Sequence, residues 1–181
     1  EVRRIAGANG QCRILDLGTG TGAIALALLS VVPQAEAVGT DISDDALETA
    51  RRNADINFVP ERFTALKSNW FQNVDGQFDV IVSNPPYIPT AELETLPREV
   101  REHDPRAALD GGPDGLEPYR LIAAQAQERL TREGLIAVET GYDQKAAVAA
   151  IFADEGYAAL KAARDLGGRD RAMLFAFRPE S

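Results

Sequence analysis

Short apolar runs alternate with stretches of helical periodicity along most of the chain. The runs that predict strands are bounded by Gly, Pro or Asp and span residues 13–18, 35–42, 62–68, 77–84 and 134–141. Helical patterns follow them at residues 23–32, 45–56, 116–131 and 143–156, the second with Ser43 or Asp44 as its cap. This alternation predicts a parallel sheet with helices on both faces.

Two segments depart from the alternation. Residues 157–165 and 170–178, separated by LGGR, predict an antiparallel hairpin that completes the sheet. Residues 86–118 contain six prolines and the run DGGPDG, and are predicted to form a long loop with one short helix near 91–96. Because connections above roughly 15 residues are usually functional or disordered, we expect this loop to cover a site or contact a partner. A merely solvated acidic loop is the alternative.

Composition narrows the class of protein. At 181 residues the chain fits one domain over residues 1–181. Its 19 Lys and Arg against 28 Asp and Glu leave a net charge of −9, which argues against nucleic acid as a partner, although a local basic patch could survive. No apolar run approaches the roughly eighteen residues of a membrane span, and the start, EVRRIAGANGQ, lacks the apolar core of a signal peptide.

Cys12 and His103 are each the sole residue of their type. A lone cysteine cannot form an internal disulfide, which suits a reducing, cytoplasmic location. One Cys and one His cannot build a Cys/His metal cluster, so we expect no metal site.

The stretch DLGTGTGAIALAL places Gly18, Gly20 and Gly22 between a predicted strand and a helix. Without Cβ atoms, these positions let backbone N–H groups approach a ligand closely. With Ala23 they also satisfy the dinucleotide fingerprint, so a nicotinamide-dependent enzyme is an open alternative. Asp41 ends the second strand 41 − 22 = 19 residues later, where a carboxylate can accept hydrogen bonds from both ribose hydroxyls of an adenosine cofactor. A solvated or helix-capping carboxylate is the other interpretation of Asp41.

The fourth strand runs straight into Asn84, Pro85, Pro86 and Tyr87. Ligands of doubly wound sheets bind beyond the carboxyl ends of the strands, so this motif is expected beside the glycine loop. The Asn84 side-chain carbonyl and a main-chain carbonyl held outward by the two prolines are two acceptors for the N–H groups of a planar amide. Such a clamp aims the nitrogen lone pair at an electrophile, and Tyr87 can stack on the flat group. The electrophile this chemistry requires is the methyl group of S-adenosylmethionine.

DLGTGTG, SNWF and SNPPYIP, in this order, resemble the protein-glutamine N5-methyltransferases of peptide chain release factors (HemK/PrmC type). The resemblance extends from residue 14 to residue 177 and includes RAALDGGPDGLEPYRLI, ETGY and RDLGGRDR. It implies a Rossmann-like class I methyltransferase fold with a seven-stranded sheet. It also implies an enzyme of the EC 2.1.1 class that methylates the glutamine of a Gly-Gly-Gln loop in translation termination, with S-adenosylhomocysteine as product.

The resemblance also implies roles for individual residues. A catalytic pocket for the glutamine is implied for Asn84, Pro85, Pro86 and Tyr87. Cofactor contacts are implied for Gly18, Thr19, Gly20, Thr21, Gly22, Asp41, Trp70 and Asn84. Trp70 would pack near the adenine, or else be an ordinary core residue. Asn69 stands where many relatives carry Asp, which puts a charged contact to the adenine in doubt.

The family normally has a small helical domain before the methyltransferase domain, and this chain is expected to begin after it. Asn-Pro-Pro-Tyr also occurs in enzymes that methylate exocyclic amines of RNA or DNA, so that activity is one alternative. A cofactor-binding module without catalysis is the other.

Overall fold

The computed structural model describes residues 11–103 and 105–178. Its strands are β1 (Cys12–Leu17), β2 (Ala35–Asp41), β3 (Phe63–Lys67), β4 (Phe78–Ser83), β5 (Leu130–Glu139), β6 (Tyr157–Arg164) and β7 (Asp170–Phe177). Its α-helices are α2 (Ala23–Val31), α3 (Asp44–Ile56), α4 (Arg98–His103), α5 (Glu117–Ala126) and α6 (Lys145–Asp154). The segment EVRRIAGANG, where no signal-peptide core is expected, lies outside the described residues.

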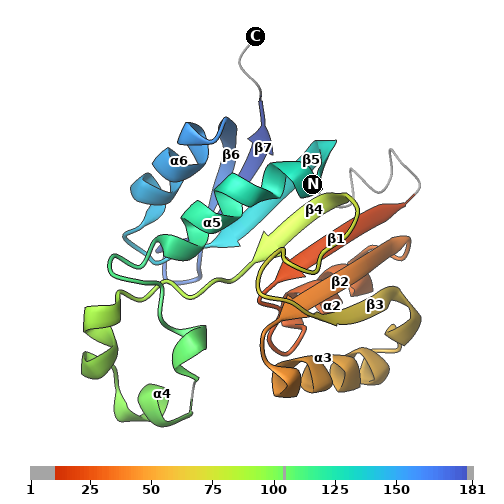
Figure 1. Ribbon diagram of the computed structural model, residues 1–181, viewed down its shortest axis with the longest axis horizontal. Coiled ribbons are helices and arrows are strands. Elements are labelled where there is room, and N and C mark those ends of the chain that lie inside the picture. The colour runs from red at the N-terminus through yellow and green to blue at the C-terminus, as the bar shows by residue number, and fades with distance from the viewer. Residues whose placement is uncertain (1–10, 104, 179–181) are drawn as a thin grey trace. The chain divides into compact units, whose positions relative to one another are not determined.

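The strands form a seven-stranded sheet in the order β3-β2-β1-β4-β5-β7-β6 (Figure 1). The β1–β2, β1–β4 and β2–β3 pairs are parallel, and β6 and β7 are antiparallel. The predicted α/β fold with a C-terminal hairpin is therefore confirmed. The chain divides into two compact units: residues up to 83 with 126–137, and residues 84–125 with 138 onward. That residues 1–181 act as one methyltransferase domain stays a prediction.

In the first unit, α2 and α3 pack on strands β1 to β3, and Figure 1 shows α3 running beside β3. The predicted cap of α3 is confirmed, since Ser43 Oγ accepts a hydrogen bond from Ala46 N at 3.3 Å. Leu47, Ala50 and Ala54 form the buried stripe of this helix. The small side chains of Ala50 and Ala54 let α3 lie close to the sheet.

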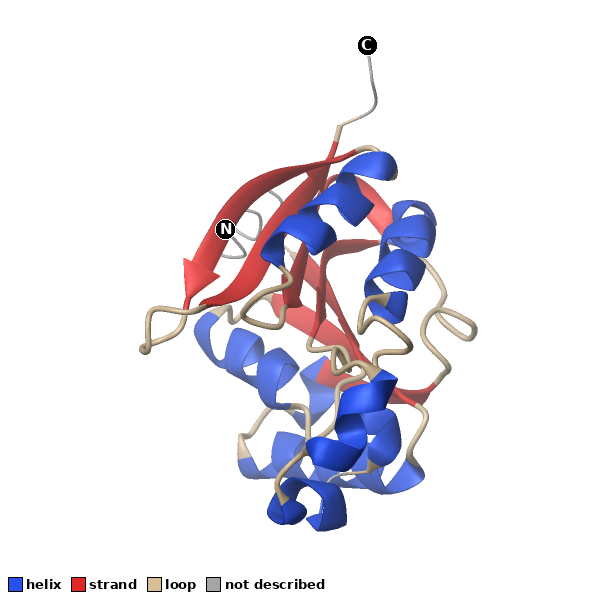
Figure 2. Ribbon diagram, turned by 90° about the vertical axis from the view of Figure 1, so that its left-hand side faces the viewer, coloured by secondary structure: helices blue, strands red, loops and turns tan. Residues whose placement is uncertain are grey.

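In the second unit, α6 packs across the β6–β7 hairpin (Figure 2). The contact is aromatic: Phe152 of α6 stacks on Phe175 of β7 with ring centroids 4.1 Å apart, and meets Tyr157 of β6 edge-on at 5.6 Å. All three rings are buried. Large aromatic side chains of this kind supply most of the apolar area that a small unit can bury.

The segment 86–118 corrects one expectation, because its described residues are not structureless. The predicted short helix near 91–96 is present as the 3-10 helix η2 (Thr90–Thr95), and α4 and the 3-10 turn η3 (Arg106–Ala108) follow it, within the green segment at the lower left of Figure 1. A proline begins each turn. Pro89 and Pro105 cap η2 and η3, and the carbonyl of Pro97 accepts from Val100 N in α4. The fixed φ of proline suits a helix start, which explains why a proline-rich segment is helical here.

The helix predicted over 116–131 is also too long. It ends as α5 at Ala126, passes through the 3-10 turn η4 (Gln127–Arg129), and gives way to β5 at Leu130. From Leu130 onward the chain is a strand, although the sequence pattern is still helical. Thr131 Oγ1 in this strand donates to Asp79 Oδ1 in β4 at 3.2 Å.

Candidate active site

The glycine loop follows β1 and leads into α2. Gly18, Gly20 and Gly22 all have positive φ, at 66°, 54° and 81°, a conformation that other residues rarely adopt. A Cβ atom on Gly18 or Gly20 would meet no described atom within 4 Å, whereas one on Gly22 would lie 3.3 Å from the Ala50 side chain. The first two glycines therefore border open space, and the third allows α2 to begin close to α3.

Two contacts hold this loop against the end of β2. Thr19 N donates to the carbonyl of Thr40 at 2.8 Å, and Gly20 N donates to Asp41 Oδ2 at 3.0 Å. Asp41 Oδ1 accepts from Ser43 N at 2.9 Å. Thr21 is exposed and Thr19 is buried. Asp41 thus braces the loop, and since a carboxylate accepts about four hydrogen bonds, it keeps capacity for a ligand hydroxyl on each oxygen.

Asp16 is a functional candidate that the sequence reasoning missed. It is 1% exposed within β1, and its Oδ2 accepts from Thr19 Oγ1 at 2.8 Å and from Ala25 N at 3.2 Å. Its Oδ1 has no hydrogen-bond partner among the described residues. Burial, together with the nearby Asp41 charge, raises the pKa of Asp16 from its usual 3.8 to about 6, against the lowering effect of its two donors. A carboxyl placed inside an otherwise apolar strand run was the available signal.

Trp70 lies in the turn after β3 and is half-buried rather than in the core. Its φ of 51° is an outlier for a bulky side chain, and its carbonyl accepts from Ser68 Oγ at 2.8 Å. The turn starts beside the end of β2, because Ser68 N donates to the carbonyl of Asp41 at 3.0 Å. Asn69, in the same turn, is exposed.

The Asn-Pro-Pro-Tyr segment opens the second unit directly after β4. Asn84 is exposed and Pro85 is buried. No described residue hydrogen-bonds the Asn84 side chain or the Pro85 carbonyl. Ser83, the last residue of β4, is fixed by its Oγ donating to the carbonyl of Leu17 at 2.7 Å. The strand end is therefore tied to β1, and the acceptors that follow it have no hydrogen-bond partner among the described residues.

Tyr87 is held at both its ends. Its main-chain carbonyl accepts from Gln144 Nε2 at 2.9 Å, and its hydroxyl accepts from Arg171 Nη1 at 3.4 Å. Burial, with the Glu139 carboxylate, raises the pKa of Tyr87 above its usual 10, and Arg171 partly opposes this. The phenol is neutral at physiological pH. Pro86 is half-buried between Pro85 and this tyrosine.

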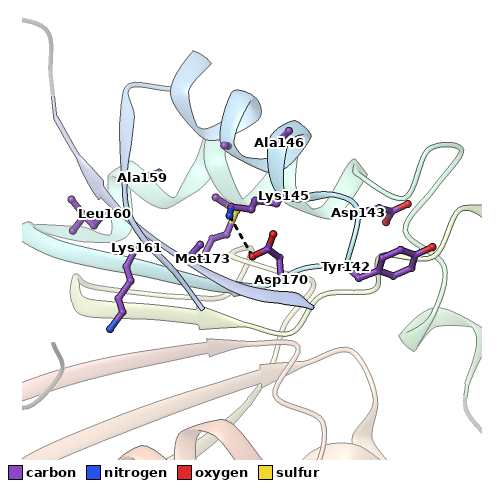
Figure 3. A pocket seen from close by; sticks show the side chains of 11 residues that line it. Tyr142, Asp143, Lys145, Ala146, Ala159, Leu160, Lys161, Asp170 and Met173 are labelled. Carbon is purple, nitrogen blue, oxygen red and sulfur yellow. Dashed lines mark hydrogen bonds and ion pairs between the residues drawn. The ribbon is translucent and has the colours of Figure 1, made fainter. Parts of the chain in front are cut away.

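A separate hollow of about 610 Å³ lies between α6 and the β6–β7 hairpin (Figure 3). Ala146 of α6 and Leu160 of β6 are among its lining residues, and the Lys145–Asp170 ion pair crosses it with an N–O distance of 3.3 Å. It contains none of the predicted site residues. Within residues 11–103 and 105–178, no group of three or more His, Cys, Asp or Glu is arranged to hold a metal ion. No helix in the same ranges is long and apolar enough to cross a membrane.

Solved structures resemble this fold at low sequence identity. A ribosomal protein L11 methylase from Lactobacillus delbrueckii subsp. bulgaricus aligns with a TM-score of 0.70 and 21% identity over 93% of this chain and 71% of that one. TrmN from Thermus thermophilus aligns with a TM-score of 0.67 and 19% identity over 98% of this chain and 47% of that one. These likenesses establish a shared fold.

Curated relatives are much closer in sequence. A release factor glutamine methyltransferase from Agrobacterium fabrum is 58% identical over 92% of this chain, and one from Caulobacter vibrioides is 46% identical over 89%. The predicted resemblance to this group is confirmed. The chain spans 57% and 56% of the length of these two relatives. Residues 5–100, more than half of the 181, match the family described as "Methyltransferase small domain". Together with the glycine loop and the fold, this match shows that the chain belongs to the methyltransferase small-domain family.

Proposed function

We propose that this chain is the catalytic part of an enzyme that methylates N5 of a glutamine side chain in the Gly-Gly-Gln loop of peptide chain release factors. The methyl donor is S-adenosylmethionine, and S-adenosylhomocysteine is the product. The relatives' names support this substrate, at 46–58% identity over about nine tenths of the chain. The observation that carries the chemistry is the pair of unengaged acceptors at Asn84 and Pro85. A release factor substrate would also place the protein in the cytoplasm.

The first unit has the features that a nucleoside cofactor requires. Gly18 and Gly20 border open space on a loop of positive φ, so a ligand can approach the main chain there. Asp41 would accept the ribose hydroxyls while it continues to hold Gly20 N. We assign the adenine side to Trp70, whose strained turn begins at the strand next to Asp41. When bound, S-adenosylmethionine supplies a methyl group that is activated toward nucleophiles.

The Asn84 motif would supply the orientation that a carboxamide needs. The lone pair of an amide nitrogen is delocalised, so the group reacts only when it is held in line with the electrophile. The Asn84 side-chain oxygen and the Pro85 carbonyl would each accept one N–H of the glutamine, which leaves the nitrogen lone pair directed away from both. The nitrogen would then form the N–CH₃ bond as the S–CH₃ bond breaks, with sulfur keeping the electron pair in S-adenosylhomocysteine, and it would lose one proton to water. Pro86 and Tyr87 would form the wall on which the flat amide rests.

The experiment is methyl transfer by the full-length enzyme to a purified release factor and to its variant with Ala in place of the Gly-Gly-Gln glutamine, followed by peptide mass mapping. We expect label on that glutamine and none on the variant.

Asn84→Ala should lower turnover about 10²- to 10³-fold, as loss of one preorganised polar contact does elsewhere. Asn57→Ala, an exposed asparagine at the end of α3, is the matched control. Label on RNA or DNA instead of the release factor would establish the alternative activity, and full turnover in Asn84→Ala would rule out the clamp.

A further inference from the structure

Gln144 occupies an unusual place in the second unit. It is the N-cap residue of α6, yet its side chain makes no capping bond to a described backbone N–H. Ser, Thr, Asp and Asn are preferred at this position because a short side chain reaches the first free amides of the helix. The longer glutamine gives up that bond, which indicates that its side chain is required elsewhere.

The Gln144 amide joins three segments of the second unit. Nε2 donates to the carbonyl of Tyr87 at 2.9 Å and to the carbonyl of Gly115 at 3.2 Å. Oε1 accepts from Gly141 N at 3.0 Å, just beyond β5. Both N–H groups and one oxygen lone pair are therefore used by main-chain atoms. One side chain ties the Asn-Pro-Pro-Tyr segment to the DGGPDG run and to the exit of β5.

The two glycines near this contact lie so close to neighbouring atoms that neither position has room for a Cβ atom. A Cβ atom on Gly115 would clash with the Tyr87 carbonyl and lie 2.8 Å from Gln144 Nε2. One on Gly111 would lie 2.8 Å from Tyr87 Cα and 2.9 Å from the Pro86 carbonyl. These glycines let the DGGPDG run approach the motif closely enough for a single amide to bond both.

The same two segments are paired beyond this point. Ile88 N donates to the carbonyl of Leu109 at 3.0 Å, and Gly111 N donates to the carbonyl of Ile88 at 2.9 Å. Thr90 N and Thr90 Oγ1 donate to Gly112 O at 2.9 Å and to Asp110 Oδ1 at 2.6 Å. Ile88 and Asp110 form a short parallel bridge between the two segments. Gln144 adds a further link between them on the Tyr87 side of this bridge, through the carbonyls of Tyr87 and Gly115.

We propose that Gln144 is a positioning residue for methyl transfer: it fixes the main chain of the Asn-Pro-Pro-Tyr motif through the Tyr87 carbonyl, and does not itself touch the substrate. The inference rests on the proposed function, because it is the substrate pocket of that reaction that Gln144 holds. The donor groups are essential to this role. A glutamate would keep the acceptor for Gly141 N but would face two carbonyl oxygens without a proton to donate.

Two variants of the full-length protein separate positioning from folding. Gln144→Ser shortens the side chain out of reach of Tyr87 but introduces a good N-cap, so α6 gains a bond as the motif loses its own. Gln144→Glu keeps the length and removes both donors. Gln125→Ser, an exposed position on α5, is the control.

Both Gln144 variants should bind S-adenosylmethionine within about twofold of wild type by calorimetry. Their kcat for a release factor should fall about 10- to 100-fold with a smaller change in KM, because a displacement of about 1 Å at the reacting groups costs about that much. Amide hydrogen exchange at Ile88 and Gly111 should be faster in both variants and unchanged in the control.

Transfer within twofold of wild type in Gln144→Ser and Gln144→Glu would overturn the proposal, and so would unchanged exchange at Ile88 and Gly111. If wild type itself does not methylate the release factor glutamine, the proposed function fails. The exchange rates then still decide by themselves whether Gln144 fixes the motif.

Discussion

Asp16 shows how a single buried carboxyl can organise the glycine loop. Its Oδ2 accepts from Ala25 N, the third residue of α2, whose N-cap position is a glycine without a side chain. The same oxygen accepts from Thr19 Oγ1 within the loop. Asp16 therefore caps α2 from the neighbouring strand while it holds the loop that precedes this helix.

The raised pKa of Asp16 predicts a specific dependence of stability on pH. Since the pKa is about 6 in the folded chain and 3.8 ordinarily, the folded state binds this proton more tightly. The stabilisation that protonated Asp16 gives the folded state is fully present below pH 4 and is lost as the pH rises through 6. It amounts to on the order of 3 kcal/mol. Asp16→Asn cannot ionise, and its difference in unfolding free energy from wild type should shift in favour of the variant between pH 4.5 and pH 7. Urea denaturation at both pH values measures this, and a pH-independent difference would contradict it.

Asp41 differs from Asp16 in being only half-buried and in keeping free acceptor capacity. If it holds the cofactor ribose, Asp41→Ala should weaken S-adenosylmethionine binding roughly ten- to a hundredfold, since charge-assisted hydrogen bonds are worth about 1.5–3 kcal/mol each. Calorimetry of the variant against wild type tests this. Asp45→Ala, in the exposed first turn of α3, serves as the control. Equal affinity in Asp41→Ala and wild type would refute the ribose role.

At the scale of the elements, the RDLGGRDR stretch forms the turn of the β6–β7 hairpin and the residues on either side of it. Asp165 N and Gly168 N make the turn bonds to Arg169 O and Asp165 O, both at 2.9 Å. The Asp165 carboxylate then accepts from Arg171 Nη2 at 3.3 Å, and Arg171 Nη1 donates to the Tyr87 hydroxyl at 3.4 Å. The turn therefore orients an arginine toward the tyrosine of the Asn-Pro-Pro-Tyr motif.

A double-mutant cycle tests this hairpin contact. Arg171→Ala should lower kcat/KM for the release factor about three- to tenfold, a modest loss because the bond is long and the guanidinium is about one-third exposed. In a Tyr87→Phe background the same substitution should have little further effect. Arg171→Lys should recover only part of the loss, because an ammonium lacks the planar fork that bonds both partners. Additive losses in the double variant would show that Arg171 acts through something other than the hydroxyl.

Strands β1 to β4 were predictable to within a few residues because each is an apolar run with a breaker at its end. The short helix η2 was predicted, whereas α4 and η3 were not, since such short elements carry no periodicity and depend on prolines that ordinarily signal loops. The start of β5 at Leu130 was not predicted because the next four residues, TREG, do not continue an apolar run. The glycine loop and the Asn84 motif could be predicted because each is a short local pattern in the sequence. Gln144 and Arg171 act on Tyr87 from 57 and 84 residues away, so no local pattern points to them.

At the scale of the whole molecule, the fold does not by itself select a substrate. Proteins named as an L11 methylase and as TrmN share this architecture at 21% and 19% identity. The acidic charge of −9 gives no general attraction for nucleic acid. We therefore expect selection to come from the contacts around the reacting group.

The part of the relatives' length that this chain does not span leads to the last prediction. Because the chain spans 57% of the Agrobacterium fabrum relative, we expect the remainder of that relative to contribute binding energy for the protein substrate. Such binding energy raises kcat/KM, by a factor of ten for about every 1.4 kcal/mol. The relative trimmed to the region that this chain matches should bind S-adenosylmethionine within about threefold of the full-length form, since the glycine loop and Asp41 lie inside that region. Its kcat/KM for a release factor should be at least about tenfold lower, and a free glutamine-containing peptide should not distinguish the two forms. Equal kcat/KM on the intact release factor would show that the 181-residue region contains all of the substrate contacts.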